Sequence, residues 1–163
     1  MQMRILIVED DQASSLVLEM FLQHVGETHT EMDGEAGLRA FRNALEEGHP
    51  FDLVTLDIMM PKLDGQGVLK GIRALETQHA VDSHKAVKVI MTTALDDKLN
   101  IVEALPRCDA YLTKPIDRTQ LMFYIKKFGL LSEAEAREAA LRAMKRRTDN
   151  RSSHEGEETP WVG

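Results

Sequence analysis

Five short strand-like runs, four of them mainly apolar, are separated by segments of helical periodicity and constrain the fold of this chain more than any other feature. The runs lie at residues 4–8, 27–32, 51–57, 87–93 and 110–113. The first of them, RILIV, is rich in β-branched residues and shows no polar alternation, which is typical of a strand buried on both faces. The second is more polar, and we interpret it as a weaker strand.

The segments between and after these runs predict five helices. Leu16, Val17 and Met20 recur at helical spacing after the first run, and Gly26 is the predicted stop of that helix. The other four predicted helices cover residues 35–45, 65–75, 96–105 and 118–128. Because parallel strands need crossovers, which helices on both sheet faces supply, the order predicts an α/β fold with a doubly wound, five-stranded parallel sheet.

Composition narrows the class of protein further. The chain has 163 residues, of which 43% are hydrophobic and 29% charged, and a formal net charge of −7, which argues against non-specific binding of nucleic acid. A single cysteine, Cys108, cannot form an intrachain disulfide, as expected in a reducing compartment. The chain shows neither a signal peptide nor an apolar stretch of about 20 residues, so we expect a cytoplasmic protein without a membrane partner.

Polar side chains follow four of the five predicted strands. In chain order they are Glu9, Asp10 and Asp11, then Asp57, then Thr92 and Thr93, and finally Lys114. Doubly wound sheets bind ligands at this carboxyl edge, where clustered acids repel one another and a hard divalent ion such as Mg²⁺ would take their oxygens as ligands. Each residue alone also has a structural explanation, because acids after strands often cap helices and a Lys-Pro pair often forms a turn. Their combination predicts a Mg²⁺ site.

The motifs around these residues resemble those of the receiver domain of bacterial two-component response regulators, over about residues 3–128. ILIVEDD resembles the acidic-pair motif, with Glu9 and Asp10 in the paired positions, and LDIMMPKLDG resembles the phosphoacceptor motif around Asp57. The switch motifs VIMTTA and AYLTKP contain Thr93, Tyr111 and Lys114. The resemblance implies the chemotaxis-regulator-like, flavodoxin-like fold with strand order 2-1-3-4-5.

The sequence departs from the family pattern at two places. Arg107 and Cys108 replace a pair of small residues beside the surface that usually reads out activation, and QHAVDSHKAV lengthens the connection before the fourth strand. Neither departure touches the predicted phosphorylation site, whereas the first bears on the choice of partner.

The resemblance also implies roles for the site residues. Asp57 would be the phosphoacceptor, and Mg²⁺ would be held by Asp10, Asp57 and the backbone carbonyl of Met59, with Glu9 acting through water. Lys114 and Thr93 would contact oxygens of the phosphoryl group. Movement of Thr93 would then let the Tyr111 ring turn inward; on its own, Tyr111 also reads as an ordinary half-buried strand tyrosine.

Three other functions compete with this one. Phosphatases of the haloacid dehalogenase type place a second aspartate two residues after the first, but here that residue is Met59, which cannot transfer a proton. We therefore expect a protein that assists its own phosphorylation and is not a turnover enzyme. A degenerate receiver that acts only as a binding or dimerisation module, and an intermediate of a phosphorelay, are the remaining alternatives; the intact set of site residues argues against the degenerate form.

The expected partners follow from the resemblance and from the length of the chain. Upstream we expect a sensor histidine kinase or a phosphotransfer protein. Only 35 residues follow Phe128, fewer than a helix-turn-helix domain usually needs. We therefore expect a stand-alone receiver, residues 1–129, that contacts a downstream protein and no DNA.

The last part of the chain predicts a sixth helix and a tail. Ser132 and Glu135 form a capping box, and acids early and bases late in the segment match a helix dipole, so residues 130–147 are expected to be a helical extension and 148–163 a polar, flexible tail. A narrow stripe of Leu130, Ala134, Leu141 and Met144 predicts docking on its own domain or on a second protomer, hence a possible homodimer. A solvated spacer is the alternative, and Trp161 is either an anchor or incidental.

Overall fold

The computed structural model describes residues 2–94 and 107–152, and it confirms all five predicted strands to within two residues. The strands are β1 (Met3–Val8), β2 (Gly26–Glu31), β3 (Leu53–Asp57), β4 (Lys88–Thr93) and β5 (Ala110–Thr113). The helices are α1 (Gln12–Leu22), α2 (Gly34–Glu46), α3 (Gly65–Gln78), α5 (Arg118–Lys127) and α6 (Glu133–Ser152), with a 3-10 turn η1 at Ser83–Lys85. The helix predicted at 96–105 lies outside the described residues.

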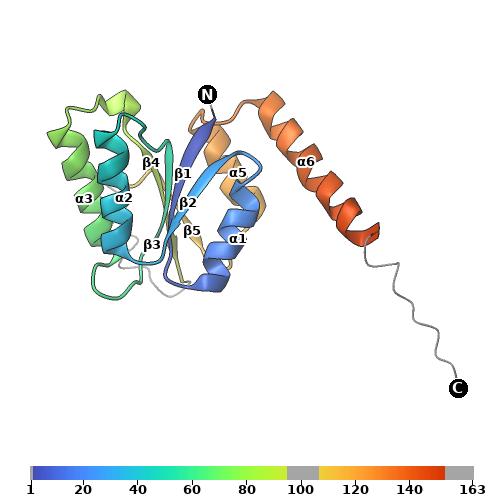
Figure 1. Ribbon diagram of the computed structural model, residues 1–163, viewed down its shortest axis with the longest axis horizontal. Coiled ribbons are helices and arrows are strands. Elements are labelled where there is room, and N and C mark those ends of the chain that lie inside the picture. The colour runs from blue at the N-terminus through green and yellow to red at the C-terminus, as the bar shows by residue number, and fades with distance from the viewer. Residues whose placement is uncertain (1, 95–106, 153–163) are drawn as a thin grey trace, which may run out of the picture.

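The strands form one parallel sheet in the order β2-β1-β3-β4-β5, which confirms the predicted doubly wound topology. Figure 1 shows α2 and α3 on one face of the sheet and α1 and α5 on the other. Because all strands run the same way, their carboxyl ends meet at a single edge, which collects the residues that follow β1, β3, β4 and β5.

The core consists of two apolar clusters, one on each face of the sheet. In β1, Leu6 and Val8 join the cluster that contains Phe41 of α2, whereas Ile5 and Ile7 join the cluster on the other face. All four β1 side chains are fully buried, as expected for a strand covered on both faces. The unbroken apolar run at residues 4–8 has its physical cause in this double coverage.

Aspartates begin all four helices of the α/β domain within the described ranges. The Asp11, Asp33, Asp64 and Asp117 carboxylates accept a backbone N–H three residues on, in α1, α2, α3 and α5 respectively. Such caps satisfy one of the donors that a helix start leaves without an intrahelical partner. They also set where each helix starts after its strand.

Gly26 has a different role from the predicted helix stop, and that prediction is wrong. Helix α1 ends at Leu22, followed by the cap residue Gln23, and Gly26 is the first residue of β2. A Cβ atom at Gly26 would lie 2.5 Å from the carbonyl oxygen of Met3, closer than a side chain can approach. The glycine therefore permits β2 to pair closely with β1.

Helix α6 begins at the predicted capping box and continues beyond its predicted end. The Ser132 backbone N–H donates to Glu135 Oε2 at 2.8 Å, and the Glu135 N–H donates to Ser132 Oγ at 3.2 Å. The helix extends to Ser152, five residues past the predicted end at 147, because the sequence contains no glycine or proline before Gly156 to stop it.

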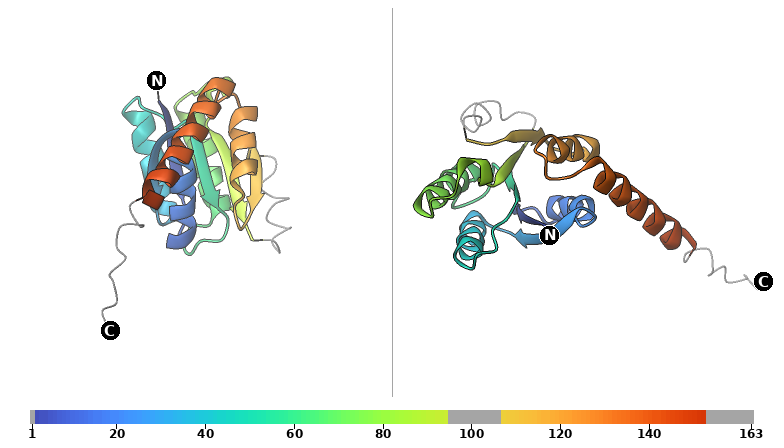
Figure 2. Two further views of the ribbon diagram at one scale, coloured as in Figure 1. Left: turned by 90° about the vertical axis from the view of Figure 1, so that its right-hand side faces the viewer. Right: turned by 90° about the horizontal axis from the view of Figure 1, so that it is seen from above.

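Among the side chains of this segment that the structure describes, those at the base of α6 pack against the domain core. Leu131 and Ala136 pack into the core cluster on the face covered by α1 and α5, which contains Ile5 and Ile7 and is called the α1–α5 cluster below. In contrast, Leu141 and Met144 are 58% and 67% exposed. Figures 1 and 2 show the helix running out from the domain. Docking of its apolar stripe on its own domain, one of the two predicted alternatives, is therefore wrong beyond the first turns. Within the described ranges, no helix combines the length and apolar character that a membrane span requires.

Candidate functional site

Three carboxylates meet at the carboxyl edge of the sheet. Glu9 and Asp10 directly follow β1, and Asp57 is the last residue of the neighbouring strand β3. One oxygen of each lies within 4.8 Å of the others. Glu9 is 0% and Asp57 4% exposed, whereas Asp10 is exposed to solvent. The sheet therefore brings together the three acids that the sequence predicted to meet.

Lys114 directly follows β5, and its side chain reaches this cluster past the end of β4. Its ammonium nitrogen lies 2.8 Å from Glu9 Oε2 and 3.2 Å from Asp57 Oδ1. Its backbone N–H donates to the Thr93 carbonyl at 2.7 Å, which holds the start of the β5–α5 connection against the end of β4. The following peptide, Lys114–Pro115, is cis.

The charges in the cluster shift one another's protonation. Burial, reinforced by the negative charge of Glu9, raises the pKa of Asp57 to about 6, and Lys114 opposes this rise only in part. Burial also works against the charged form of Lys114, but its hydrogen bond to Glu9 and the charge of Asp57 prevail and raise the pKa of Lys114. Glu9 and Asp57 thus share the ammonium group of Lys114, Asp10 adds a third carboxylate nearby, and the site has an excess of negative charge.

Asp11 is not part of the cluster. Its carboxylate caps α1, and the hydrogen bonds with Ser14 lower the pKa of Asp11. Asp10 and Asp11 are adjacent in sequence and have the same side chain. Their roles differ because the two side chains point in different directions. The structure assigns the cap to Asp11 and the place beside Asp57 to Asp10.

The residues of this edge are chemically suited to Mg²⁺. The donor set consists of carboxylate oxygens, which are the hard ligands that this ion prefers, and one or two of them suffice when water completes the shell. The unbalanced negative charge around buried Asp57 favours a cation at the same place. Met59, whose carbonyl is the remaining predicted ligand, lies two residues after Asp57 in the loop that follows β3.

The loop after β3 is held tightly against the end of the strand. The Gly65 N–H donates to the Ile58 carbonyl at 2.9 Å, and Asp64 accepts from the Gly67 N–H at 2.8 Å. A Cβ atom at Gly65 would lie 2.2 Å from the carbonyl oxygen of Asp57. Only glycine allows α3 to begin this close to Asp57, and the compact loop fixes the backbone from which the Asp57 carboxylate projects.

The two predicted switch residues lie on neighbouring strands. Thr93 ends β4 fully buried, with its hydroxyl donating to the Ala94 carbonyl at 3.1 Å. Tyr111 lies on β5 with its side chain exposed, beside Phe123 of α5 in a shallow surface cavity. Thr93 therefore lies at the edge that bears the acids, and Tyr111 at a surface formed by β5 and α5.

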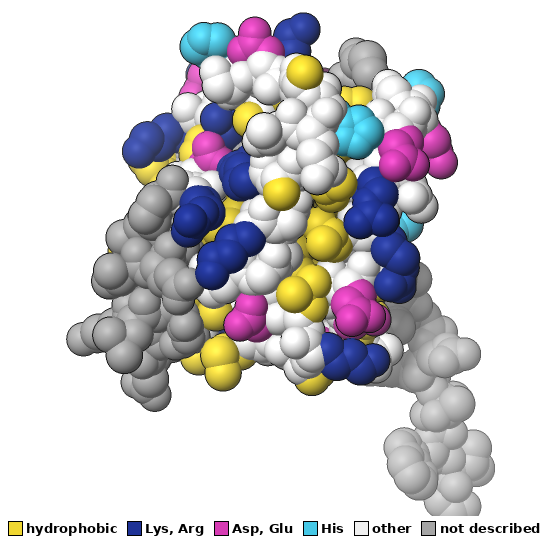
Figure 3. All heavy atoms as spheres, turned by 90° about the vertical axis from the view of Figure 1, so that its left-hand side faces the viewer, with side chains coloured by type: hydrophobic (Ala, Val, Ile, Leu, Met, Phe, Trp, Pro, Cys, Tyr) yellow, Lys and Arg dark blue, Asp and Glu magenta, His cyan; other side chains and the backbone are white. Residues whose placement is uncertain are grey.

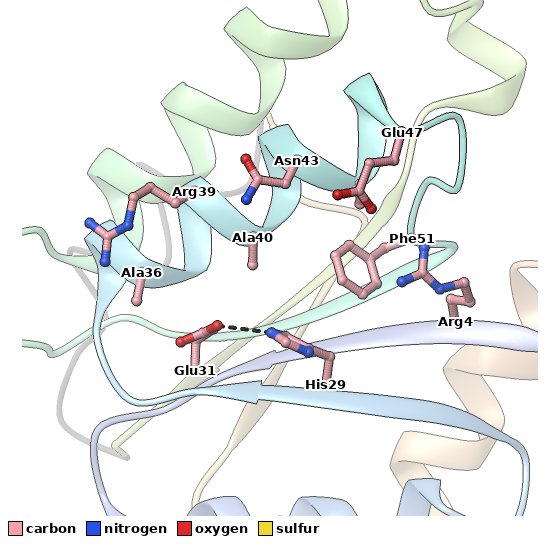
Figure 4. A pocket seen from close by; sticks show the side chains of 10 residues that line it. Arg4, His29, Glu31, Ala36, Arg39, Ala40, Asn43, Glu47 and Phe51 are labelled. Atoms are coloured by element: carbon pink, nitrogen blue, oxygen red, sulfur yellow. Dashed lines mark hydrogen bonds and ion pairs between the residues drawn. The ribbon is translucent and has the colours of Figure 1, made fainter.

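A separate cavity of about 370 Å³ lies between α2 and β2 (Figure 4). His29 and Glu31 form a pair at 2.8 Å on β2, and Arg39 and Phe51 are among the residues that line the cavity. On the side of the molecule formed by α2 and α3, acidic, basic and apolar side chains are interspersed (Figure 3). Neither feature offers a convergent set of groups comparable to the acidic edge.

Comparison with known proteins identifies the kind of domain in which such an edge occurs. Residues 5–126 match the family described as the response regulator receiver domain. The chain is 35% identical over 149 residues to a probable transcriptional regulator, ycf27, of Cyanophora paradoxa, covering 90% of this chain and 50% of that protein. The chain thus spans about half the length of the curated relatives it matches.

Two solved structures are similar over most of this chain. One is the receiver domain of the Saccharomyces cerevisiae response regulator Ssk1 in complex with the histidine phosphotransfer protein Ypd1, with a TM-score of 0.67, 28% identity, and coverage of 79% of this chain and 90% of that one. The other is the CheX–CheY–BeF3–Mg²⁺ complex of Borrelia burgdorferi, with a TM-score of 0.63, 26% identity, and coverage of 77% and 87%.

Proposed function

This chain belongs to the response regulator receiver domain family, whose members accept phosphoryl groups in two-component signalling, and from that premise we propose that Asp57 is its phosphoacceptor. The observation that carries the proposal is the position of Asp57. Asp57 is the last residue of β3, is 4% exposed, and lies 3.2 Å from the ammonium group of Lys114. Glu9 is also buried and lies 2.8 Å from Lys114, but only Asp57 stands in the LDIMMPKLDG motif that resembles the phosphoacceptor motif. Phosphoryl transfer depends mainly on positioning and charge neutralisation, which this arrangement offers.

In the proposed reaction, a carboxylate oxygen of Asp57 attacks the phosphorus of a phosphohistidine. The new O–P bond forms as the P–N bond to the imidazole breaks, and the imidazole leaves with the electron pair. Asp10, Asp57 and the Met59 carbonyl would hold Mg²⁺, with Glu9 acting through water, and the ion would offset charge on the phosphoryl oxygens. Lys114 already lies beside Asp57, and its mobile ammonium group would contact another of these oxygens.

The signal would arise from the added charge. A phosphoryl group brings about −1.5 to −2 charges at neutral pH. The Thr93 hydroxyl would turn from the Ala94 carbonyl to donate to it, and the exposed Tyr111 ring would then move inward. This biases the surface formed by β5 and α5 between two states, and a downstream protein would bind one of them.

The proposed partners and location follow from the same chemistry. The Ypd1 complex supports a phosphotransfer protein or histidine kinase as the upstream partner, and the CheY complex supports Mg²⁺ as the ion. We place the protein in the cytoplasm as a signalling module. It is not a turnover enzyme, because Met59 occupies the position where a second aspartate would act as general acid.

A second candidate is favoured by the curated relatives. They are about twice as long as this chain, and those in Cyanophora paradoxa and Bacteroides fragilis are named as transcriptional regulators. In that case the receiver would control a DNA-binding partner, either on the same polypeptide or on another. The expectations of a stand-alone receiver and of an output without DNA therefore remain predictions.

Incubation with a small phosphodonor and Mg²⁺ tests the primary assignment. Intact-mass measurement should find one added phosphoryl group, lost on mild base treatment as acyl phosphates are. Asp57→Asn should abolish the addition, and Asp11→Asn, the matched control, should retain it. Uptake by Asp57→Asn at the wild-type rate would mean that another residue is the acceptor.

A further inference from the structure

Helix α6 exposes a surface that the phosphorylation chemistry does not use. Its base is anchored by Leu131 and Ala136 and by an ion pair of 3.5 Å between Lys126 and Glu133. From Arg137 to Lys145, every described side chain is exposed, and Figure 1 and the right view of Figure 2 show the helix running away from the domain. A projecting helix whose described side chains are exposed over this range offers a surface to a partner.

The charges of α6 are divided along its length. Residues 133–140 contain three glutamates and one arginine, whereas residues 141–152 contain five basic residues and one aspartate. The helix dipole favours such charges only within the first and last turns. Glu138 and Arg142 lie further in, where the dipole does not account for the division. Glu138 forms an i,i+4 ion pair with Arg142, Glu133 pairs with Lys126, and Glu135 accepts from the Ser132 N–H. These contacts lie at the surface and do not change the order of the charges along the helix.

A helix of this pattern is complementary to itself when two copies run antiparallel. The acidic half of one copy then faces the basic half of the other at both ends, whereas a parallel pair would place like charges together. An antiparallel pair is related by a two-fold axis and closes as a dimer, so it does not extend into a filament.

The apolar side chains lie where that two-fold axis would pass. Leu141 and Met144 fall one on each side of the midpoint of α6 and share a helix face because they are three residues apart. They are 58% and 67% exposed. In an antiparallel pair centred at the midpoint, Leu141 of each copy would contact Met144 of the other, and both side chains would be removed from water.

We propose that α6 is a self-association surface that pairs antiparallel with α6 of a second copy of this chain. The association uses no residue of the phosphorylation site and stands independently of the proposed function. A helix of 20 residues is about 30 Å long, so the contact is smaller than a standard interface. The dimer should accordingly be weak and dependent on concentration.

Charge reversal in each half of α6 tests the pairing. One variant, Glu133→Lys with Glu138→Lys, makes both halves basic; the other, Arg142→Glu with Lys145→Glu and Arg147→Glu, makes both acidic. Sedimentation velocity over a concentration series of the full chain should show a monomer–dimer equilibrium for wild type. Each variant alone should associate at least about tenfold more weakly, which corresponds to about 1.4 kcal/mol. An equimolar mixture of the two variants should recover the dimer.

A charge-matched control separates pairing of α6 from the effect of net charge. Glu27→Lys with Glu46→Lys makes the same change in net charge as the basic variant at exposed positions of β2 and α2, and it should associate like wild type. Circular dichroism should show that all variants keep their helix content. A wild type that stays monomeric throughout, variants that each dimerise like wild type, or a mixture that gains nothing over its components would each overturn the proposal.

Discussion

At the scale of single residues, the site stores unfavourable charge before any ligand arrives. Glu9 and Asp57 are both buried and share the Lys114 ammonium group, at 2.8 and 3.2 Å, while Asp10 adds a third negative charge. A protein selected for stability alone would not gather three carboxylates around one lysine. The arrangement is understandable if a cation completes it.

The pH dependence of the metal-free protein should reveal this stored charge. The pKa of Asp57 is raised from 3.8 to about 6 in the folded state, so folding binds its proton more tightly. Its contribution to the free energy of unfolding is therefore fully present below about pH 4 and is lost as the pH rises through about 6, by an amount on the order of 3 kcal/mol. Urea unfolding in a chelator should show this loss for wild type.

Asp57→Asn provides the control for that measurement. The variant cannot titrate at this position and should be more stable than wild type at neutral pH, by on the order of 1 to 2 kcal/mol, with the difference shrinking in acid. If both proteins lose the same stability between pH 4 and pH 7, other groups dominate and the assignment to Asp57 fails.

Magnesium should stabilise the folded protein through Asp10 and not through Asp11. An ion that binds only the folded state raises its melting temperature by mass action. Asp10→Asn should abolish most of this rise. Asp11→Ala should lower the melting temperature itself, because loss of the α1 cap costs about 1 kcal/mol, yet retain the rise with Mg²⁺. Calorimetry with and without Mg²⁺ distinguishes the two effects. If both variants lost the Mg²⁺-dependent increase in melting temperature equally, the assignment of Glu9 and Asp10 as the acidic pair would be wrong.

At the scale of helices and strands, the sequence predicted what local rules determine. Apolar runs gave the strands, and aspartates such as Asp64 and Asp117 began helices close to where cap chemistry predicts. Prediction from sequence failed where contacts between distant chain segments determine the role of a residue. Gly26 resembles a helix stop in sequence, but it is needed because Met3, far away in the chain, pairs beside it.

The site could be predicted for a related reason. Parallel strands bring their carboxyl ends to one edge, so Glu9, Asp57 and Lys114 are placed together by topology alone. The choice between Asp10 and Asp11 could not be made from the residues themselves, because either can cap α1. The apolar positions of α1 were likewise ambiguous, since Leu16 is exposed although it continues the helical pattern.

Arg73 of α3 is a structural centre that the sequence did not reveal. Its guanidinium donates to the carbonyls of Arg107 and Val87, each at 3.0 Å, and pairs with Glu76 at 2.7 Å and Asp109 at 3.1 Å. These groups come from the ends of α3, β4 and β5, up to 36 residues away along the chain. No local pattern in the sequence marks such a convergence.

Removing Arg73 should therefore destabilise the fold without touching the acidic site. Arg73→Met keeps much of the volume but leaves Glu76, which is buried, without its charge partner, and we expect a loss of about 3 kcal/mol in the free energy of unfolding. Arg73→Lys keeps the positive charge but loses the planar guanidinium, so its free energy of unfolding should lie between those of wild type and Arg73→Met. Urea unfolding measures the loss, and phosphorylation of the folded fraction should be unchanged. A loss below about 1 kcal/mol for Arg73→Met would show that the network contributes little.

At the scale of the whole molecule, the acidic cluster and the base of α6 lie at opposite edges of the sheet. The acids and Lys114 gather at the carboxyl ends of the strands, whereas α6 leaves near the amino end of β1, where Met3 and Leu131 line the same groove (Figure 1).

Truncation separates the part of the extension that belongs to the domain from the part that projects. Leu131 is buried against the α1–α5 cluster, and Leu130 packs beside it, so ending the chain after Gly129 should remove about 2 kcal/mol of apolar burial and lower the melting temperature by about 5 °C. Ending the chain after Arg137 keeps both leucines and Ala136 and should leave the melting temperature of the dilute monomer within about 1 °C of wild type. The truncation after Arg137 thus separates a loss of self-association from a loss of folding stability. If both truncations destabilised the monomer equally, the exposed half of α6 would have to contact its own domain in solution, and the projecting helix would not be the form that is free to pair.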